Sequence, residues 1–180
     1  MVEKDILKVL INEDEIKDKV KEMGEILTRD YKSKDLLIVG VLKGCVMFLS
    51  DLVKEINLPL TMDFMVVSSY GSSTKSSGVV RIVKDLEKDI SGKDVLIVED
   101  IVDTGLTLNY LVDYLISRHA NSVRVCTLLD KKIERDIDVD LEYVGFRIPD
   151  EFVVGYGLDY NEIYRNLPFI CILKPEVYSE

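Results

Sequence analysis

The stretch VLIVEDIVDTGLTL, from Val95 to Leu108, decides how this chain is expected to fold. It begins with an unbroken apolar run, which predicts a strand buried on both faces, as in a parallel sheet. Two carboxylates, Glu99 and Asp100, stand where that strand is expected to end, and a third, Asp103, opens a tight turn into an amphipathic helix. A buried strand, a turn and a helix start are the parts with which open parallel sheets hold phosphorylated ligands.

The sequence on both sides of this stretch predicts further strands and helices of the same kind. The apolar run Leu36–Leu42 predicts a second buried strand, and a helix is expected soon after Lys43 and Gly44. Further strands are expected at residues 61–67, 79–85, 122–130, 141–146 and 169–173, and helices near residues 12–27, 46–56 and 108–116. We therefore expect an α/β fold in one domain, an open, twisted, mainly parallel sheet flanked by helices.

Composition limits the classes of function. The chain has 180 residues, of which 47% are hydrophobic and 31% charged, which is typical of one globular domain with a sizeable core. The net charge of -10 argues against bulk electrostatic binding to nucleic acid. The apolar runs are shorter than a membrane span requires, and the acidic amino terminus lacks a signal-peptide core. We therefore expect a cytoplasmic protein that binds neither membrane nor nucleic acid.

Histidine and cysteine are scarce, which narrows the chemistry further. The single histidine, His119, follows a predicted helix, and this argues against a Ser/His/Asp relay or a multi-histidine zinc site. The three cysteines, Cys45, Cys126 and Cys171, show no metal-binding spacing and are expected to be reduced and mostly buried. Acid/base chemistry must then rest on carboxylates, lysine or tyrosine.

The turn from Asp103 to Thr107 has the composition of a phosphate-binding site. Its small residues expose backbone N–H groups at the positive end of a helix, and its two threonine hydroxyls add donors. The adjacent carboxylates Glu99 and Asp100 suit the two hydroxyls of a ribose. A simpler alternative is an acidic strand end that caps a helix. Neither GxxxxGK[ST] nor GxGxxG occurs, so the site is not a P-loop or a dinucleotide-binding turn.

A long polar segment, SSYGSSTKSSG at residues 68–78, separates two strands that fit one hairpin. Its serine and glycine content cannot supply a packed core, which predicts a mobile loop. An active-site lid is the preferred interpretation, because structureless loops of this length inside compact domains are usually functional or disordered. A passive loop and a domain linker are the alternatives.

Four hydrophobic residues, two acidic residues and then two hydrophobic residues followed by Asp-Thr-Gly-x-Thr resemble the phosphoribosyl-pyrophosphate motif of the type I phosphoribosyltransferases. The resemblance covers most of the chain. Leu42-Lys43-Gly44 resembles the family's diphosphate loop, residues 128–135 its purine-facing strand end, and residues 144–165 its carboxy-terminal hood. It implies a core of about residues 1–148 and a hood mainly from about residues 149–180. The aspartate at Asp103 is similar to that of the 6-oxopurine branch, which acts on hypoxanthine and guanine.

The resemblance implies a role for each matching residue. Asp103 would be the catalytic general base and acid. The implied sugar-phosphate ligands are Glu99, Asp100, Asp103, Thr104, Gly105, Leu106 and Thr107. The implied diphosphate ligands are Lys43, Gly44 and Arg165. The implied purine-binding residues are Lys131, Phe152, Val153 and Asp159. The implied carboxylates for Mg²⁺ are Glu99, Asp100 and Asp159, and the implied lid residues are Ser69 and Tyr70.

The same resemblance implies a purine-salvage reaction. Magnesium-dependent transfer of 5-phosphoribosyl from 5-phospho-α-D-ribose 1-diphosphate to hypoxanthine or guanine would give IMP or GMP, in a homodimer or homotetramer. The alternatives are an enzyme for another base such as xanthine, a regulator that keeps the sugar-phosphate site and binds RNA or DNA, and a nucleotide-binding domain without chemistry. The net charge, Asp103 and Lys131 argue against the regulator.

Overall fold

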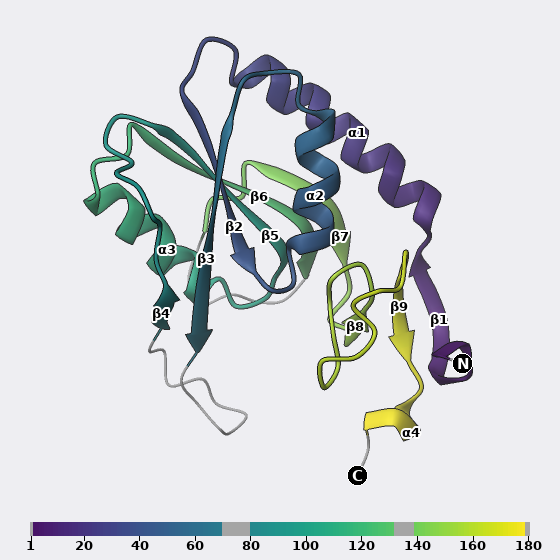
Figure 1. Ribbon diagram of the computed structural model, residues 1–180. Coiled ribbons are helices and arrows are strands. Elements are labelled where there is room, and N and C mark those ends of the chain that lie inside the picture. Colours follow the sequence, from purple (N-terminus) through teal and green to yellow (C-terminus); the bar gives the residue numbers. More distant parts are fainter. Residues whose placement is uncertain (1, 70–79, 132–138, 179–180) are drawn as a thin grey trace.

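The computed structural model describes residues 2–69, 80–131 and 139–178 of the chain. A six-stranded sheet with helices on both faces forms its centre (Figure 1). In chain order the elements are η1 (Val2–Asp5), β1 (Ile6–Ile11), α1 (Glu13–Asp30), β2 (Leu36–Leu42), α2 (Val46–Glu55), β3 (Thr61–Ser69), β4 (Val80–Lys84), β5 (Asp94–Val102), α3 (Leu106–Ser117), β6 (Ser122–Lys131), β7 (Tyr143–Ile148), β8 (Val153–Val154), β9 (Ile170–Leu173) and α4 (Pro175–Tyr178).

The order of strands in the large sheet is β4-β3-β2-β5-β6-β7. All neighbouring pairs are parallel except β3 and β4, which are antiparallel as expected for a hairpin. The predicted open, mainly parallel α/β sheet is confirmed. In the part of the chain that the structure describes, no helix is both long and apolar enough to cross a membrane.

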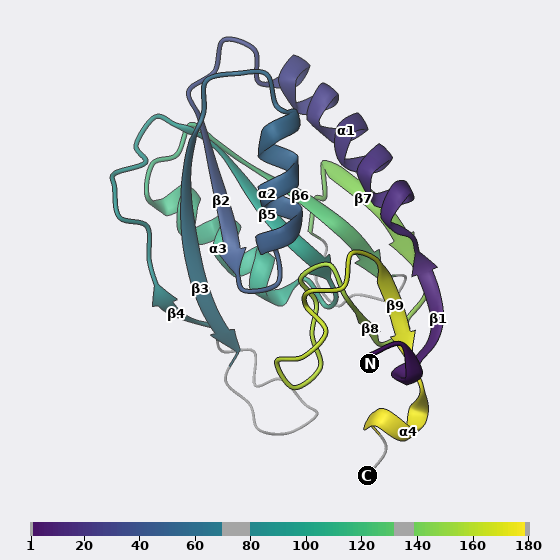
Figure 2. The same cartoon turned by 45° about the vertical axis from the view of Figure 1, so that its right-hand side comes forward.

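The central strands are buried because helices cover both faces of the sheet. On one face, Leu96 and Val98 of β5 pack in a cluster with residues of α1 and α2. On the other face, Val95 and Ile97 pack with residues of α3. Figure 2 shows the two helix layers on opposite sides of the sheet. The uninterrupted apolar runs in the sequence therefore reflect strands without a solvent-facing side.

Helix α1 begins where the sequence predicts it. The Asn12 side chain accepts the backbone N–H of Glu15 at 2.9 Å, and the Glu15 side chain accepts the N–H of Asn12 at 2.8 Å, which completes a capping box. The predicted apolar face of this helix is buried, at Ile16, Val20, Met23 and Leu27. In α3, predicted as an amphipathic helix, Leu108, Leu111 and Leu115 are buried whereas Ile116 is exposed.

A second, three-stranded sheet of order β1-β9-β8 forms the hood. Strand β1 pairs antiparallel with β9, so both ends of the chain build this unit. The sequence-based division places the hood mainly in about residues 149–180 and stays a prediction, and Ile6–Ile11 from the amino-terminal end pairs with that region. No strand was predicted there, and in the structure Leu7 and Val9 of this edge strand are exposed.

Two other predictions concern the cysteines and the lid. Cys45, Cys126 and Cys171 are free and buried, as expected. Of the predicted lid residues, Ser69 is the last residue of β3 and pairs with Val80 of β4. Tyr70 lies outside the described residues, so the lid stays a prediction.

Candidate functional site

The predicted site residues gather where β2, β5 and β6 end side by side. Lys43 and Gly44 directly follow β2, Asp103 follows β5, and Lys131 is the last residue of β6. Because these strands are parallel neighbours, their carboxyl ends meet at one edge of the sheet. The hood lies beside the same edge (Figures 1 and 2).

A pocket of about 170 Å³ opens at the end of β5. Its lining residues are Glu99, Ile101, Val102, Asp103, Thr104, Gly105, Thr107 and Leu108. Gly105 caps α3 with a φ of 81°, a left-handed conformation that glycine adopts without steric penalty. The pocket therefore combines a helix start with two threonines, as the sequence predicts for a phosphate site. Leu106, the first residue of α3, is not among the lining residues.

The acidic pair is divided between two faces of the strand. Strand β5 continues to Val102, so Glu99 and Asp100 lie inside it rather than at its end. Glu99 is 8% exposed and lines the pocket, whereas Asp100 approaches Gly44 on the side of the hood. Because successive strand residues point to opposite faces, the two carboxylates approach the sheet edge from different sides, and their joint contact with one ribose stays a prediction.

Two glycines allow the loop after β2 to pack between the core and the hood. A Cβ atom on Gly44 would lie 1.7 Å from Oδ2 of Asp100. A Cβ atom on Gly157, in the hood, would lie 2.0 Å from the carbonyl oxygen of Gly44. The peptide bond between Leu42 and Lys43 at the start of this loop is cis. At Gly157 the obstacle is backbone and a Cβ atom has no room, whereas at Gly44 a Cβ atom would require the Asp100 carboxyl group to move.

Both strand carboxylates resist ionisation. Burial, opposed by the N–H of Ile101 and by Arg165, raises the pKa of Asp100 to about 6. Burial and then the neighbouring charge of Asp100 raise the pKa of Glu99 well above its usual value. Asp159 also raises the pKa of Asp100. These acids therefore lack enough nearby positive charge to offset their desolvation.

The donor set fits a magnesium ion that is shared with a ligand. Among the residues that the structure describes, no group of three or more His, Cys, Asp or Glu side chains converges on one point. Mg²⁺ is commonly held by one or two carboxylates, with substrate phosphates and water as the other ligands. The Asp100 carboxylate meets that requirement. It offers a hard oxygen ligand, it lies beside Gly44 in the loop after β2, and nearby positive charge does not offset its burial.

The cations predicted for the diphosphate site already contact acidic side chains. Arg165 Nη2 lies 2.8 Å from Asp159 Oδ1 and 3.3 Å from Glu162 Oε2, and its Nη1 donates to the carbonyl of Gly157 at 2.7 Å. Lys43 Nζ lies 3.0 Å from the same Glu162 oxygen. The Nε of Arg165 is buried without a hydrogen-bond partner in the described part of the molecule. Sequence reasoning missed Glu162, whose only signal was its place between an aspartate and an arginine.

Lys131 joins the phosphate pocket to the predicted purine side. Its Nζ lies 3.8 Å from Oδ2 of Asp103 and 3.5 Å from Oδ1 of Asp150. The structure therefore brings together the predicted general base and the predicted purine-binding lysine. Because lysine is a donor only, it can bind a carbonyl oxygen presented beside Asp103.

The hood supplies an aromatic cluster. The ring of Phe152 is 43% exposed and packs 5.8 Å, centroid to centroid, from both Tyr160 and Tyr178. An exposed ring held by two others can stack on a planar ligand. The side chain of Val153 is buried in the core, so only its backbone is available to a ligand.

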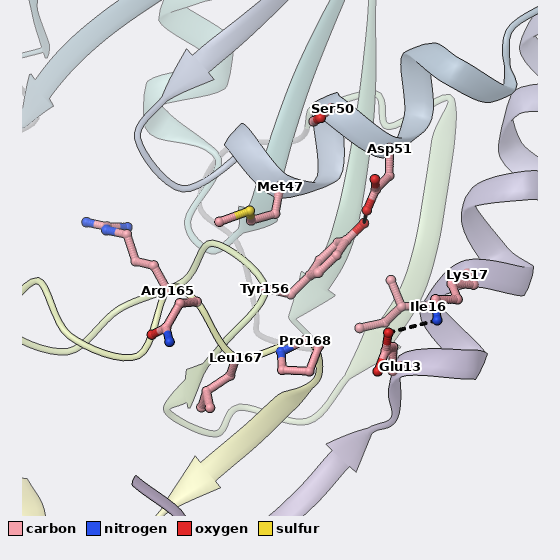
Figure 3. Close-up of a pocket in the computed structure, with 11 residues that line it drawn as sticks. Glu13, Ile16, Lys17, Met47, Ser50, Asp51, Tyr156, Arg165, Leu167 and Pro168 are labelled. Atoms are coloured by element: carbon pink, nitrogen blue, oxygen red, sulfur yellow. Dashed lines mark hydrogen bonds and ion pairs between the residues drawn. The ribbon is translucent and has the colours of Figure 1, made fainter. Parts of the chain in front are cut away.

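A separate cavity of about 250 Å³ lies between helices α1 and α2 and residues 156–168 of the hood, which we call the hood loop (Figure 3). Residues of α1, α2 and the loop line it, and Tyr156 donates its hydroxyl to Asp51 Oδ2 at 2.7 Å across it. Figure 3 shows the Arg165 guanidinium pointing away from the other side chains of this cavity. Arg165 lines this cavity, but Glu99, Asp100 and Asp103 do not, so we place the site at the sheet edge.

Comparison with known proteins identifies related chains. Residues 11–161 match the family model of the phosphoribosyl transferase domain. The chain is 56% identical to hypoxanthine-guanine phosphoribosyltransferase of Bacillus subtilis over 179 residues, which is 99% of each chain. A crystal structure of a hypoxanthine phosphoribosyltransferase from Staphylococcus aureus aligns with a TM-score of 0.96 at 54% identity, covering 99% of this chain and 97% of that one. The chain is also 57% identical to the bifunctional protein TilS/HprT of Listeria monocytogenes but spans only 27% of its length.

Replacement of Gly44 by alanine tests the packing of the diphosphate loop. The new Cβ would collide with the Asp100 carboxylate, so the Gly44→Ala protein should lose about 2 kcal/mol of unfolding free energy in urea denaturation. In an Asp100→Ala background the same change should be much less destabilising. Equal destabilisation in both backgrounds would show that the two groups are not in contact.

The raised pKa of Asp100 predicts a pH-dependent stability. The folded protein binds more protons than the unfolded chain between the ordinary pKa of 3.8 and about 6, so its stability falls as pH rises through that window. Asp100→Asn should remove this loss and stabilise the ligand-free protein at pH 7 by about 1–3 kcal/mol, with no gain near pH 4. Thermal unfolding from pH 4 to 8 measures the difference, and a constant difference across that range would contradict the prediction.

Proposed function

Because this chain belongs to the phosphoribosyltransferase family, we propose that it transfers 5-phosphoribosyl from 5-phospho-α-D-ribose 1-diphosphate to N9 of hypoxanthine and/or guanine. The products are IMP or GMP and diphosphate, a purine-salvage reaction. The observation that carries the proposal is the meeting of the Asp103–Thr107 pocket with Lys131 at one sheet edge, where the Lys131 and Asp103 side chains lie 3.8 Å apart. The names of the relatives at more than half identity support the choice of base.

The pocket at the end of β5 would hold the sugar phosphate. Backbone N–H groups and threonine hydroxyls of Asp103–Thr107 bind the 5-phosphate at the positive end of α3. Glu99, which lines the same pocket, and Asp100 accept hydrogen bonds from the ribose hydroxyls. These contacts hold C1′ of the sugar at the sheet edge and convert a bimolecular reaction into one between positioned groups.

The loop after β2 and the hood would hold the diphosphate. The backbone of Lys43 and Gly44 offers N–H groups, and Arg165 offers a guanidinium that can bind two oxygens at once. The carboxylates of Glu99, Asp100 and Asp159 would hold a magnesium ion, which when bound would supply positive charge to the diphosphate. Positive charge fixed in advance at the leaving group lowers the barrier without reorganisation during the reaction.

The base would bind between the hood and the end of β6. Phe152 stacks on the purine, the backbone of Val153 contacts its edge, and Lys131 donates to the 6-oxo group. N9 attacks C1′ from the face opposite the leaving diphosphate, which inverts that carbon. Asp103 accepts the proton from N7 as N9 reacts, and no covalent intermediate with the protein is required. The lid with Ser69 and Tyr70 would exclude water, which competes for the oxocarbenium-like centre.

The location, oligomeric state and partners that we propose for the protein rest on the same family relationship. We propose a cytoplasmic homodimer or homotetramer whose partners are its small-molecule substrates. The exposed apolar side chains of Val46 and Met47 at the start of α2 are consistent with a subunit contact. The net charge of -10 is consistent with the absence of a nucleic-acid partner.

A base panel tests the proposed function directly. Nucleotide formation from 5-phospho-α-D-ribose 1-diphosphate and Mg²⁺ is measured with hypoxanthine, guanine, xanthine, adenine and uracil. We expect product with hypoxanthine or guanine, and discrimination against adenine by roughly 10⁴, because its amino group faces the donor Lys131. Product with xanthine alone would reassign the base. No product with any 6-oxopurine would refute the enzymatic proposal.

Replacement of Asp103 by asparagine tests the proton transfer. Asparagine keeps the size of the side chain but cannot accept the proton, so Asp103→Asn should lower kcat by about 10²- to 10⁴-fold. Binding of IMP, measured by calorimetry, should change by less than about threefold because the phosphate contacts come mainly from the backbone. Unchanged kcat would exclude the acid/base role of Asp103.

A further inference from the structure

We propose that Glu162 is an internal counterion of the diphosphate site, a carboxylate that stands between Lys43 and Arg165 until diphosphate displaces it. This inference rests on the proposed function, because the diphosphate of the sugar substrate is the ligand that takes its place. Glu162 thereby becomes a positioning residue that sets the affinity for diphosphate-bearing ligands. It does not take part in bond making or breaking.

The geometry of one oxygen atom carries the proposal. Glu162 Oε2 lies 3.0 Å from Lys43 Nζ and 3.3 Å from Arg165 Nη2, so it bridges two cations that come from different parts of the fold. Lys43 follows β2 in the core, whereas Arg165 belongs to the hood. A single anionic oxygen between a lysine and an arginine is the arrangement that a phosphate oxygen would adopt at the same place.

The backbone of the hood loop directs Glu162 to this position. The Glu162 N–H donates to Oδ2 of Asp159 at 2.8 Å, and Tyr160 pairs with Ile163 across the same tight turn. Asn161 and Glu162 have positive φ values of 50° and 65°. The geometry of this turn therefore directs the Glu162 side chain toward the loop after β2.

The carboxylate is placed to exchange with a ligand. The side chains of Lys43 and Glu162 are 67% and 64% exposed, so their ion pair is well solvated and individually weak. Lys43 and then Arg165 lower the pKa of Glu162, which keeps it anionic at neutral pH. Arg165 also contacts Asp159 and the carbonyl of Gly157, so it stays in place when Glu162 leaves.

Competition between Glu162 and diphosphate has a measurable consequence. Any diphosphate that enters must first break two ion pairs of Glu162, which weakens its net binding. The carboxylate can return when diphosphate departs, which favours release of the product. Without the carboxylate charge, the two cations would be available to diphosphate at no such cost, and the ligand should bind more tightly.

Binding of inorganic diphosphate to the Glu162→Gln protein tests this proposal. Calorimetric titration with Mg²⁺ and diphosphate at 0.15 M ionic strength should give a Kd about threefold to tenfold lower than that of the wild type, a modest gain because the Glu162 carboxylate is 64% exposed in both ion pairs. In initial-rate kinetics the KM for 5-phospho-α-D-ribose 1-diphosphate should fall, whereas the KM for the purine should not change. A purely structural role would not separate the two constants.

Glu22→Gln is the matched control. Glu22 is 57% exposed and pairs with Lys19 on α1, so the variant loses the same charge away from the site. Its Kd for diphosphate should equal that of the wild type at this ionic strength, because exposed charges beyond about 8 Å are largely screened. Tightening by the same factor in both variants would reduce the effect to net charge and overturn the proposal.

The remaining outcomes separate this inference from the function on which it rests. An unchanged or higher Kd in Glu162→Gln, with an unaltered unfolding temperature, would show that Glu162 only supports the cations. A wild-type protein that binds diphosphate but forms no nucleotide would refute the transferase reaction while the counterion role is still decided by the two Kd values. A wild-type protein that forms nucleotide but does not bind diphosphate would overturn the counterion role while the transferase reaction stands.

Discussion

The close approach of Asp100, Gly44 and Gly157 is the contact on which the site depends. It brings a strand of the core, the loop after β2 and the hood into close contact. A Cβ atom on Gly157 would clash with the Gly44 backbone, and one on Gly44 would displace the Asp100 carboxyl group. Because Arg165 donates to the carbonyl of Gly157, the guanidinium is held in a set position relative to the diphosphate loop. A small packing constraint thus fixes the relative places of groups from three separate segments.

The same packing creates an electrostatic imbalance. Enclosure by the loop and the hood removes Asp100 from water, and burial also desolvates Glu99, so the pKa of each carboxyl is raised. Nearby, the cations Lys43 and Arg165 contact Glu162 instead of a ligand. The ligand-free site therefore holds acids that need positive charge and cations with a replaceable partner. A bound metal–diphosphate would supply both, which is a reason for such a site to be less stable when it is empty.

Local patterns predicted much of the fold and the centre of the site. The bounds of β2 and the capped start of α1 follow from a continuous apolar run and from a side chain that bonds within its own helical turn. The pocket at Asp103–Thr107 follows from a small-residue turn at a helix start. Each of these signals lies within a few neighbouring residues, where the chemistry of the chain is readable without knowledge of its tertiary contacts.

The sequence by itself therefore determined the mainly parallel α/β core and the small-residue turn, Asp103–Thr107, that lines the pocket after β5. Only the tertiary structure decided that Ile6–Ile11 joins the hood, because its partner strand β9 lies at the other end of the chain. It also decided that Glu99 and Asp100 face different sides, since β5 continues past them. The position of Glu162 between two cations likewise depends on Lys43, 119 residues away. Contacts of this kind depend on how distant segments pack, and no local pattern encodes them.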